Sequence, residues 1–476
     1  MNFGYTQPAI SEELGSSGSR AAAERNVYAF GSRGRSLGEI DGVSVPALLA
    51  EFGSLLFVFS ERTLRGHARR AHEAFESRYP RTSFAWSFKT NYLDAICQAF
   101  RQEGWIAEVV SDFEYEKARR LGFAGDEIVF NGPYKPRPIL ERAVAEGALV
   151  QIDNWDELAL VEELVSGSEK PVSVGLRVWL DAGVQPIWSK FGFALANQDA
   201  GRAAARVVAN PRLRLHTLHT HIGTYILAPQ AYGTAARKLL GLRQDISDTL
   251  GHVVPCLNLG GGFPSNSLLH GMAGPAEAQV PPIEAYAAAI ADVLAGLPAA
   301  QQPLLRLETG RHLIDEAGYL LTRVVAVKGP LAHAGATADL VARANKERAI
   351  LGDEPEASYI LDAGINLLYT AAWYRYSVMP ARASAAPAVP SRLYGSLCMA
   401  IDVIRDRVAL PPMEVGDALS LHPVGAYNVV QSMQFIQYRP AVVLIDPDGT
   451  PRLIRAREQL EDIERAEHLP AHLSPA

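Results

Sequence analysis

The chain is poor in cysteine and has neither a cluster of basic residues nor a long apolar run. Its three cysteines, Cys97, Cys256 and Cys398, are too few and too far apart for a disulfide framework or a zinc site. The lysines and arginines are scattered and the net charge is -7, so there is no positive field for nucleic acid or an anionic membrane. No apolar stretch approaches the length of a membrane span. These absences predict a soluble protein of the reducing cytoplasm that binds neither nucleic acid nor membrane.

Strand-like and helix-like segments alternate through the middle of the chain. Each short apolar segment is followed by one in which spaced apolar residues are separated by charged ones. The eight predicted strands are Ser83–Lys89, Ile106–Ser111, Glu127–Gly132, Leu149–Asp153, Val172–Val178, Leu213–Ile222, Pro255–Phe263 and Leu304–Arg311. This alternation predicts a parallel sheet, and eight repeats predict a closed (β/α)8 barrel of the TIM type. The chemistry of such barrels lies at the carboxyl ends of the strands, which here carry Lys89, Ser111, Asn131, Arg177, His221, Gly260–Gly262, Glu308 and Arg311.

Four parts of the chain are expected. Residues 1–26 are a flexible tail, 27–60 join a β domain through the strand Leu55–Ser60, 61–315 form the barrel, and 316–476 form a C-terminal β-rich domain. In the last part, two loops rich in alanine and proline, Leu331–Ala344 and Ala381–Ser391, are expected to be mobile. The strands predicted there are Tyr319–Lys328, Tyr359–Asp362, Val403–Ile404, Ala418–His422, Gln434–Tyr438 and Ala441–Ile445.

Lys89 ends the first predicted strand of the barrel, Ser83–Lys89. An amine at the end of a buried strand is costly unless it is paired or chemically used. One interpretation is a lysine that emerges at the strand end to reach water. The other is a desolvated amine that forms a Schiff base with a carbonyl compound or with pyridoxal phosphate. Residues further along the chain decide between them.

Two later strand ends carry groups suited to an anionic planar cofactor. Gly260–Gly262 would let backbone amides approach an anion, and the positive end of a following helix would attract phosphate, although glycine clusters are also ordinary turns. Glu308 suits a protonated pyridine nitrogen, and Arg311 suits a phosphate or a substrate carboxylate. A Glu308–Arg311 ion pair within the chain is the alternative.

His219 and His221 end the sixth predicted strand, two residues apart, so their side chains point the same way. Such a pair suits a metal ion. It also suits stacking of one imidazole on a planar cofactor, or a packed and hydrogen-bonded pair without a ligand.

Taken together, these segments resemble the pyridoxal-phosphate decarboxylases with an alanine-racemase-type barrel, a group that includes the diaminopimelate and ornithine decarboxylases. The resemblance runs from about Gly38 to Tyr438, and the shared order of modest motifs makes it specific. The matching segments are Ser87-Phe-Lys89-Thr-Asn91, Glu108-Val-Val-Ser111, Ser189-Lys-Phe-Gly192, His219-Thr-His221-Ile-Gly-Thr224, Gly260-Gly-Gly262, Glu308-Thr-Gly-Arg311, Asp362-Ala-Gly-Ile-Asn366, Cys398-Met-Ala-Ile-Asp402 and Gly425-Ala-Tyr427.

The resemblance implies pyridoxal 5'-phosphate as cofactor and a role for each matching residue. Lys89 would carry the cofactor as a Schiff base, His221 would stack on its ring, and Glu308 would pair with the pyridine nitrogen. Cys398, donated across the interface of a homodimer with shared active sites, would help protonate the carbon that has lost carbon dioxide. The residues implied to hold the phosphate or lie beside it are Thr224, Gly261, Gly262, Arg311 and Tyr427.

Two departures from the family concern the substrate. Met399 follows the cysteine where relatives carry a glutamate or aspartate able to meet a distal ammonium, and Thr370-Ala371 stands where diaminopimelate decarboxylases typically carry Arg-Pro. Both losses argue against diaminopimelate and suggest a larger conjugated amino acid, as in siderophore or natural-product assembly. The residues expected to face the substrate are Met399, Asp402, Tyr374 and Thr370.

Other functions remain as alternatives. The chain could be a diaminopimelate, ornithine or lysine decarboxylase proper, or an amino-acid racemase on the same fold, which would need a second base opposite Lys89. A metal-dependent barrel hydrolase would need further histidines and an aspartate at later strand ends, and no such set is present, so no metal is expected. A catalytically inactive relative would have no need to retain Lys89, Glu308 and Cys398.

Overall fold

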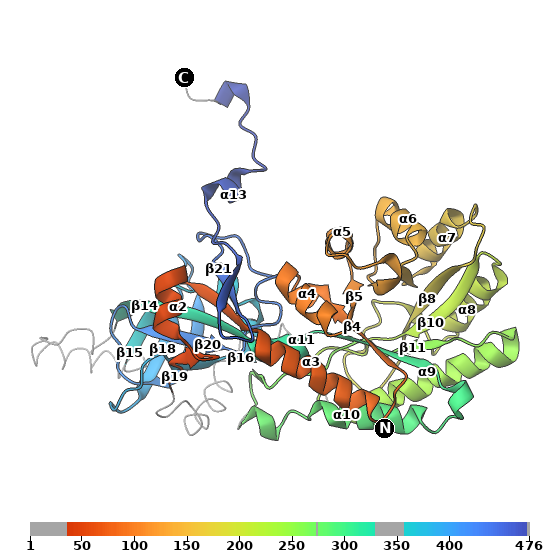
Figure 1. Cartoon of the computed structure of the whole chain (residues 1–476), viewed down its shortest axis with the longest axis horizontal. Helices are drawn as coiled ribbons and strands as arrows, with labels where there is room; N and C mark the ends of the chain where they lie inside the picture. Colours follow the sequence, from red (N-terminus) through yellow and green to blue (C-terminus); the bar gives the residue numbers. More distant parts are fainter. Residues whose placement is uncertain (1–35, 273–274, 329–356, 474–476) are drawn as a thin grey trace, which may run out of the picture. The chain divides into compact units, whose positions relative to one another are not determined.

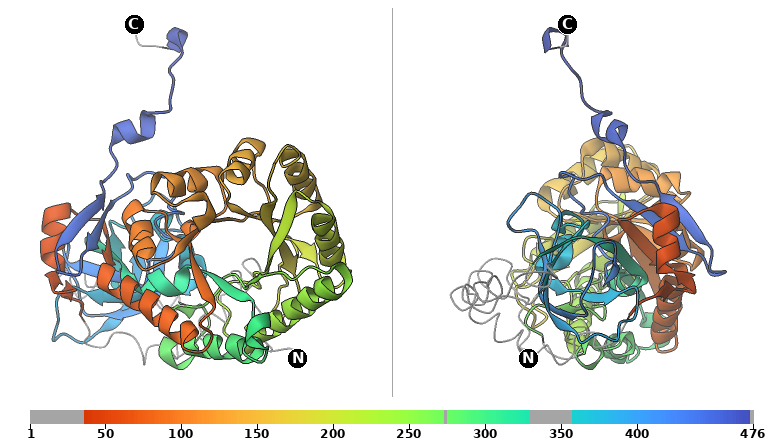
Figure 2. Two further views of the ribbon diagram at one scale, coloured as in Figure 1. Left: turned by 45° about the vertical axis from the view of Figure 1, so that its right-hand side comes forward. Right: turned by 90° about the vertical axis from the view of Figure 1, so that its left-hand side faces the viewer.

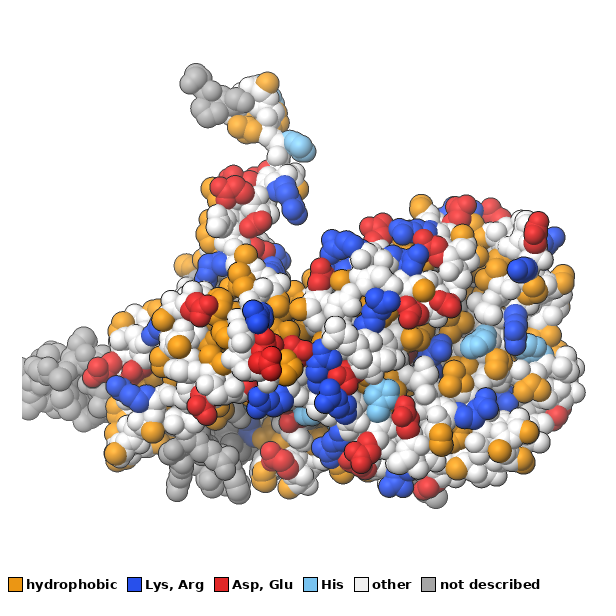
Figure 3. Space-filling view, in the orientation of Figure 1, with side chains coloured by type: hydrophobic (Ala, Val, Ile, Leu, Met, Phe, Trp, Pro, Cys, Tyr) orange, Lys and Arg blue, Asp and Glu red, His pale blue; other side chains and the backbone are white. Residues whose placement is uncertain are grey.

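The computed structural model describes residues 36–272, 275–328 and 357–473. Contacts divide these residues into two compact units: 63–267 with 275–316, and 36–62 with 268–272, 317–328 and 357–473. Acidic and basic side chains are interspersed over the faces of both units seen in Figure 3. Within the described ranges, no helix is long and apolar enough to cross a membrane. The predicted tail, residues 1–26, and the predicted loop Leu331–Ala344 lie outside the described residues.

Eight parallel strands close the first unit into a barrel, because the last strand pairs back onto the first. This confirms the predicted barrel, and the β-rich second unit completes the predicted fold class. Seven of the eight observed strands end earlier than predicted, and β8 ends one residue later. Because β4 ends at Ser87, Lys89 lies in a short 3-10 turn, η3 (Phe88–Thr90), directly after it. In barrel order the strands are β4 (Thr82–Ser87), β5 (Ile106–Val109), β6 (Ile128–Phe130), β7 (Leu149–Ile152), β8 (Val172–Trp179), β10 (Leu213–His219), β11 (Cys256–Asn258) and β13 (Leu304–Thr309).

Helices surround these strands, and the ring they form is visible in Figures 1 and 2. Two of them begin on side-chain caps just after a strand: Ser111 Oγ accepts the Glu114 amide at 3.3 Å, and Asn154 Oδ1 accepts the Glu157 amide at 2.9 Å. Ser111, one of the unusual strand-end residues, is therefore a helix cap. The helices are α4 (Asp94–Gln102), α5 (Asp112–Arg120), α6 (Arg137–Ala145), α7 (Trp155–Leu164), α8 (Asp199–Ala209), α9 (Pro229–Leu250) and α10 (Ile283–Leu294).

The second unit is built on a mixed sheet in which an early segment of the chain takes a central place. Strand β3 (Leu56–Ser60) lies between β14 (Gly318–Lys328), to which it is antiparallel, and β21 (Ala441–Ile445), to which it is parallel. Helix α2 (Val45–Phe52) packs its apolar side against this part of the sheet. The remaining strands of the sheet are β15 (Ala357–Leu361), β17 (Ser377–Pro380), β18 (Val389–Tyr394), β19 (Val403–Leu410), β20 (Ala418–His422) and β22 (Pro451–Arg455).

Two predictions for the second unit were wrong. The segment Gln434–Tyr438 is not a strand: it forms only an isolated bridge between Phe435 and Gln437, and Ile436 has a left-handed φ of 63° that breaks the extended backbone. The predicted loop Ala381–Ser391 ends in strand β18.

Candidate active site at the carboxyl end of the barrel

Three neighbouring strand ends bring two buried carboxylates together. Glu108 lies on β5, Glu308 lies on β13, and Asn131 follows β6. The Asn131 side-chain amide donates to both carboxylates, at 2.9 Å to Glu108 Oε1 and 2.8 Å to Glu308 Oε2. These hydrogen bonds are charge-assisted because their acceptors are carboxylates. They form away from bulk water because all three residues are at most 6% exposed. Asn131 thus keeps two like charges at a fixed separation.

Lys89 reaches this group through Glu108. Its Nζ lies 2.6 Å from Glu108 Oε1 and 2.5 Å from Oε2, and Ser87 Oγ donates to Oε2 at 2.6 Å. The side chain of Lys89 nevertheless keeps 42% of its surface exposed. The amine is therefore paired with a buried carboxylate, and the side chain is still open enough to reach a ligand. Lys89 thus reaches solvent, as one interpretation of its position expected, and could also form a Schiff base, as the other expected.

The Glu308 carboxylate is the centre of a second set of contacts. Asn258 Nδ2 donates to Oε1 at 2.6 Å, and His219 Nε2 lies 3.3 Å from Oε2. Burial alone would raise the pKa of Glu308, but the charge and hydrogen bond of His219 act against it. With the charge of Lys89 and the bond from Asn131, they hold the pKa of Glu308 below its ordinary value. Glu308 is consequently an ionised carboxylate at neutral pH.

His221 is held as a neutral imidazole. Its Nδ1 accepts the backbone N–H of Gly261 at 3.0 Å, so this nitrogen carries no proton. Burial, followed by the positive charges of Arg177 and Lys89, lowers the pKa of His221 well below its ordinary value. A Cβ on Gly260 would lie 2.6 Å from Nδ1, so a glycine is needed for this close approach. His219 and His221 have different partners, and the described residues contain no cluster of three or more His, Cys, Asp or Glu side chains suited to a metal.

The glycine segment brings bare backbone to the end of the barrel. A Cβ on Gly261 would lie 2.0 Å from the Glu308 carbonyl oxygen. Gly262 has a φ of +95°, and a Cβ there would lie 2.2 Å from the Gly223 carbonyl oxygen. The expected helix does not follow directly: the next helical turn described after it is Ala276–Ala278. An anion here would therefore not meet the end of a helix that directly follows the glycine segment, but it could meet backbone amides and nearby side chains.

Two further residues of the barrel unit belong to the implied phosphate group. Thr224 is half-buried, in the loop after β10. Arg311 is 8% exposed, and its Nη1 lies 3.5 Å from Asp315 Oδ2. The carboxylate oxygens of Glu308 contact Asn131, Asn258 and His219, so Glu308 does not need an ion pair with Arg311.

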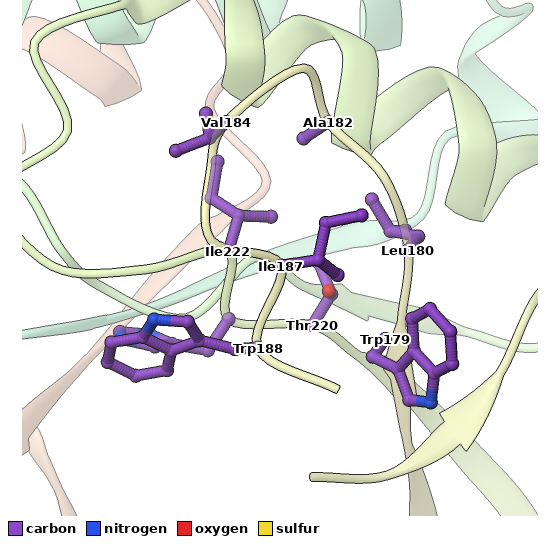
Figure 4. A pocket seen from close by; sticks show the side chains of 9 residues that line it. Trp179, Leu180, Ala182, Val184, Ile187, Trp188, Thr220 and Ile222 are labelled. Carbon is purple, nitrogen blue, oxygen red and sulfur yellow. The ribbon is translucent and has the colours of Figure 1, made fainter. Parts of the chain in front are cut away.

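A small pocket lies beside His221, and most of the residues that line it are apolar (Figure 4). Its wall comes from the loop after β8, and the Trp188 ring lies 5.2 Å from the His221 ring, centroid to centroid. Sequence reasoning missed this wall, although the aromatic residues around Ser189-Lys-Phe-Gly192 were a usable signal. The lining residues are Trp179, Leu180, Ala182, Val184, Ile187, Trp188, Thr220, His221 and Ile222.

The other predicted site residues lie in the second unit. Cys398 is exposed and Met399 is half-buried. Asp402 is 2% exposed, and both of its oxygens accept backbone N–H groups: Oδ1 from Ile365 at 2.8 Å and Oδ2 from Leu397 at 2.7 Å. Burial raises the pKa of Asp402 even though these bonds oppose the rise. The carboxylate of Asp402 therefore holds its own loop together.

Three more predicted residues in this unit have defined surroundings. The hydroxyl of Thr370 lies 2.6 Å from that of Tyr376, and both contact the Asn428 side chain. Tyr374 is buried and pairs with Leu269 in a short two-stranded sheet. Tyr427 is half-buried with a left-handed φ of 67°, an uncommon conformation for a residue with a side chain. The predicted cofactor residues other than Tyr427 thus lie in the barrel unit, and the predicted substrate residues lie in the second unit.

Comparisons with known proteins agree with this arrangement. A family model described as pyridoxal-dependent decarboxylase, pyridoxal binding domain, matches residues 65–315. The chain is 30% identical to a diaminopimelate decarboxylase of Actinosynnema pretiosum subsp. auranticum, covering 94% of this chain and 96% of that protein. It is 28% identical to one of Archaeoglobus fulgidus, covering 91% and 97%.

Solved structures of known proteins share this fold. A diaminopimelate decarboxylase from M. jannaschii matches with a TM-score of 0.79 at 25% identity, covering 92% of this chain and 97% of that one. A lysine/ornithine decarboxylase from Vibrio vulnificus, complexed with putrescine, shares the fold, with a TM-score of 0.67 at 21% identity, covering 84% and 97%.

Proposed function

The chain belongs to the pyridoxal-dependent decarboxylases and is a pyridoxal-phosphate-dependent amino-acid decarboxylase, and on this basis we propose that Lys89 carries the cofactor and that the natural substrate has no bare distal ammonium. The observation that carries the first part is the exposed amine of Lys89, held beside the buried and ionised Glu308 by Glu108 and Asn131. The second part depends on Met399 and Asp402.

The donor set at the end of the barrel fits pyridoxal phosphate. Glu308 supplies an ionised carboxylate for the ring nitrogen, and the pKa shift toward ionisation is the one this partner needs. Gly261 and Gly262 leave no space for a side chain, so backbone can lie against the phosphate. Thr224 follows Gly223, whose carbonyl lies beside Gly262, and Arg311 lies three residues after Glu308, whose carbonyl lies beside Gly261. When bound, the cofactor supplies a protonated ring that takes up the electron pair left when carbon dioxide departs.

Each protein group has a separate task in this proposal. Glu308 keeps the ring nitrogen protonated through its own negative charge. His221 would stack on the ring, and it would do so as a neutral imidazole because its Nδ1 accepts the Gly261 amide. Glu108 orients the Lys89 amine and stabilises its charge until the cofactor arrives. The apolar wall around Trp188 keeps water from the neighbouring surface of His221.

Cys398 and Tyr427 are proposed to complete the site from a partner subunit of a homodimer. The support is the family resemblance together with the exposure of the Cys398 thiol, which lies in the second unit. In this role the thiol Sγ returns a proton to the α-carbon after carbon dioxide has left. Tyr427 would lie beside the phosphate.

The substrate proposal follows from Met399, which stands where relatives carry a carboxylate able to meet a distal ammonium. Met399 offers a thioether, a weak acceptor without charge. Asp402 and Glu414 are the competing candidates for a carboxylate. Both oxygens of Asp402 already accept backbone N–H groups, and Glu414 remains as the alternative. A desolvated and unpaired ammonium costs several kcal/mol, enough to weaken binding more than about a hundredfold. Tyr374 and Thr370 are proposed to line the same substrate region, and a conjugated amino acid of a siderophore or natural-product pathway fits these requirements.

Kinetics test the substrate proposal. The unmodified enzyme should decarboxylate diaminopimelate, lysine and ornithine poorly, and Met399→Glu should raise kcat/KM for at least one of them. Efficient turnover of diaminopimelate or ornithine by the unmodified enzyme would instead favour the alternative, a diaminopimelate or ornithine/lysine decarboxylase proper. Release of carbon dioxide, measured against chiral inversion of the substrate, separates a decarboxylase from a racemase.

Borohydride trapping tests the cofactor proposal. Reduction of the purified holoenzyme should leave the cofactor covalently attached to the peptide that contains Lys89, and mass spectrometry identifies that peptide. Lys89→Ala should lose the attachment, whereas Lys170→Ala, which removes an exposed loop lysine, should keep it. Attachment that persists in the Lys89 variant would assign the cofactor to another amine.

The remaining proposals concern organisation and location. We propose the four-part division at residues 26, 60 and 315, and the cytoplasm as the site of action. The support for the second is that Cys97, Cys256 and Cys398 form no disulfide.

A further inference from the structure

A pocket of about 310 Å³ lies within the second unit, and Met399 forms part of its wall. Its floor is the face of three adjacent strands. Lys328 on β14 pairs with Ser358 on β15, and Ile360 on β15 pairs with Tyr394 on β18. The volume is at the lower end of the range for small-molecule sites, about 300–1,000 Å³. It accommodates one end of an amino acid rather than a whole cofactor.

The charged group that this pocket offers to a ligand is Lys328. Its side chain is exposed and makes no hydrogen bond or ion pair with another described residue. Asp402 also lines the pocket, but it is 2% exposed and both of its oxygens are bonded to backbone N–H groups, so its charge is directed into the loop. Among the described residues that line the pocket, a ligand therefore meets an ammonium group and no available carboxylate.

The neutral groups of the pocket suit the same ligand. Ser358 contributes a hydroxyl, and the Tyr394 hydroxyl accepts a hydrogen bond from Arg392 Nη1 at 3.2 Å, which leaves its own proton free to be donated. Ile360 and Met399 supply apolar surface for a methylene chain. Two hydroxyl donors and an ammonium at the end of an apolar wall are the complement of a carboxylate on an aliphatic chain.

From this arrangement we propose that the pocket binds the distal end of the substrate and that this end carries a carboxylate. The inference rests on the proposed function, because Met399 follows directly on Cys398, the residue proposed to return the proton to the α-carbon. One wall of the pocket therefore lies a single residue along the chain from the group proposed to act on the α-carbon. A distal ammonium would meet the like charge of Lys328, and a distal methyl group would leave that charge without a partner.

Three amino acids with six carbons test this inference, since they differ only in the distal group: L-2-aminoadipate ends in a carboxylate, L-lysine in an ammonium, and L-norleucine in a methyl group. In each case the bond between the α-carbon and its carboxylate breaks, carbon dioxide leaves, and the α-carbon gains one proton. The holoenzyme is assayed for kcat/KM with each compound. The change in cofactor absorbance on binding gives Kd independently of turnover.

The expected order is 2-aminoadipate first, ahead of both other compounds by about tenfold or more. Lys328→Met should remove this preference and Lys328→Arg should retain most of it. Lys170→Met, which removes an exposed loop lysine outside the pocket, should leave it unchanged. Measurement of Kd for all four proteins shows whether a loss lies in binding rather than in chemistry.

Several results would overturn the inference. They are a preference for lysine or norleucine, no measurable binding of 2-aminoadipate, or a preference for 2-aminoadipate that Lys328→Met leaves intact. A preference for norleucine over both charged compounds would leave the Met399 proposal standing while refuting a carboxylate site. Failure of the proposed function has a different signature: reduction with borohydride would then leave no cofactor attached to Lys89.

Discussion

Replacement of Asn131 by alanine removes the amide that bridges the two buried carboxylates. Its Nδ2 donates to Glu108 Oε1 at 2.9 Å and to Glu308 Oε2 at 2.8 Å, and the residue is 3% exposed. Neither carboxylate becomes isolated, because Glu108 retains Ser87 and Lys89, and Glu308 retains Asn258 and His219. The expected effect is therefore a loss of stability without loss of the fold.

The magnitude follows from the two charged hydrogen bonds. Each such bond contributes about 1.5–3 kcal/mol, and water that enters the vacated space recovers part of the sum, so a net loss of about 3 kcal/mol is expected. For a domain of about 250 residues, this corresponds to a fall in Tm of about 6–12 °C. Cofactor affinity should fall as well, by about tenfold, because Glu308 is no longer held from the Asn131 side.

The assay is thermal unfolding of the apoprotein, followed by titration with pyridoxal phosphate. Asn154→Ala is the matched control: it removes the cap of α7, whose Oδ1 accepts the Glu157 amide, and it leaves both bridged carboxylates untouched. The control should lose about 1 kcal/mol and bind the cofactor normally. If Asn131→Ala is no less stable than Asn154→Ala and binds the cofactor equally well, the bridge does not contribute as argued.

Three further predictions address the dimer, a buried ion pair and pH. Mixing inactive Lys89→Ala with inactive Cys398→Ala subunits should restore part of the activity, because one site of the hybrid is intact; a verified hybrid without activity would count against shared sites. Lys135→Met should lower the free energy of unfolding, measured in urea, by about 3–5 kcal/mol. The reason is that buried Glu157, which lies 2.7 Å from Lys135 Nζ, loses its cation. Adding Glu157→Gln to the Lys135→Met protein should recover part of the loss. Burial lowers the pKa of His312 from 6.5 to about 4, so its neutral form stabilises the fold above pH 6.5, and this contribution is lost as the pH falls from 6.5 to about 4. About 1–2 kcal/mol of it is lost by pH 5. His312→Gln should reduce the pH dependence of the urea midpoint between pH 6.5 and 5, and an unchanged pH dependence would contradict the assignment.

The barrel and the positions of its chemical groups were predictable from local patterns. Alternating strands and helices allow few arrangements, and the parallel direction places every strand end at one face. Lys89 and Glu308 could therefore be assigned to a common region although 218 positions of the sequence separate them. Ser111 shows the limit of the rule, because a residue at a strand end also serves as a helix cap.

The hydrogen-bond network and the pockets could not be predicted in the same way. Asn258 looks like any polar residue before a glycine turn, and only the barrel register brings it 2.6 Å from Glu308. Asp402 was a candidate for the substrate because its type fits, yet its loop consumes both oxygens. Gln434–Tyr438 has strand-like composition but forms no ladder, which shows that β propensity depends on a partner strand.

The central place of β3 in the second unit has a consequence for synthesis on the ribosome. Its residues Leu56–Ser60 are at most 1% exposed in the finished fold, but its partners β14 and β21 begin only at Gly318 and Ala441. The barrel residues emerge in between and can complete their local pairings first. Until β14 has been synthesised both edges of this apolar strand are open, and one edge stays open until β21 follows, which exposes the nascent chain to aggregation.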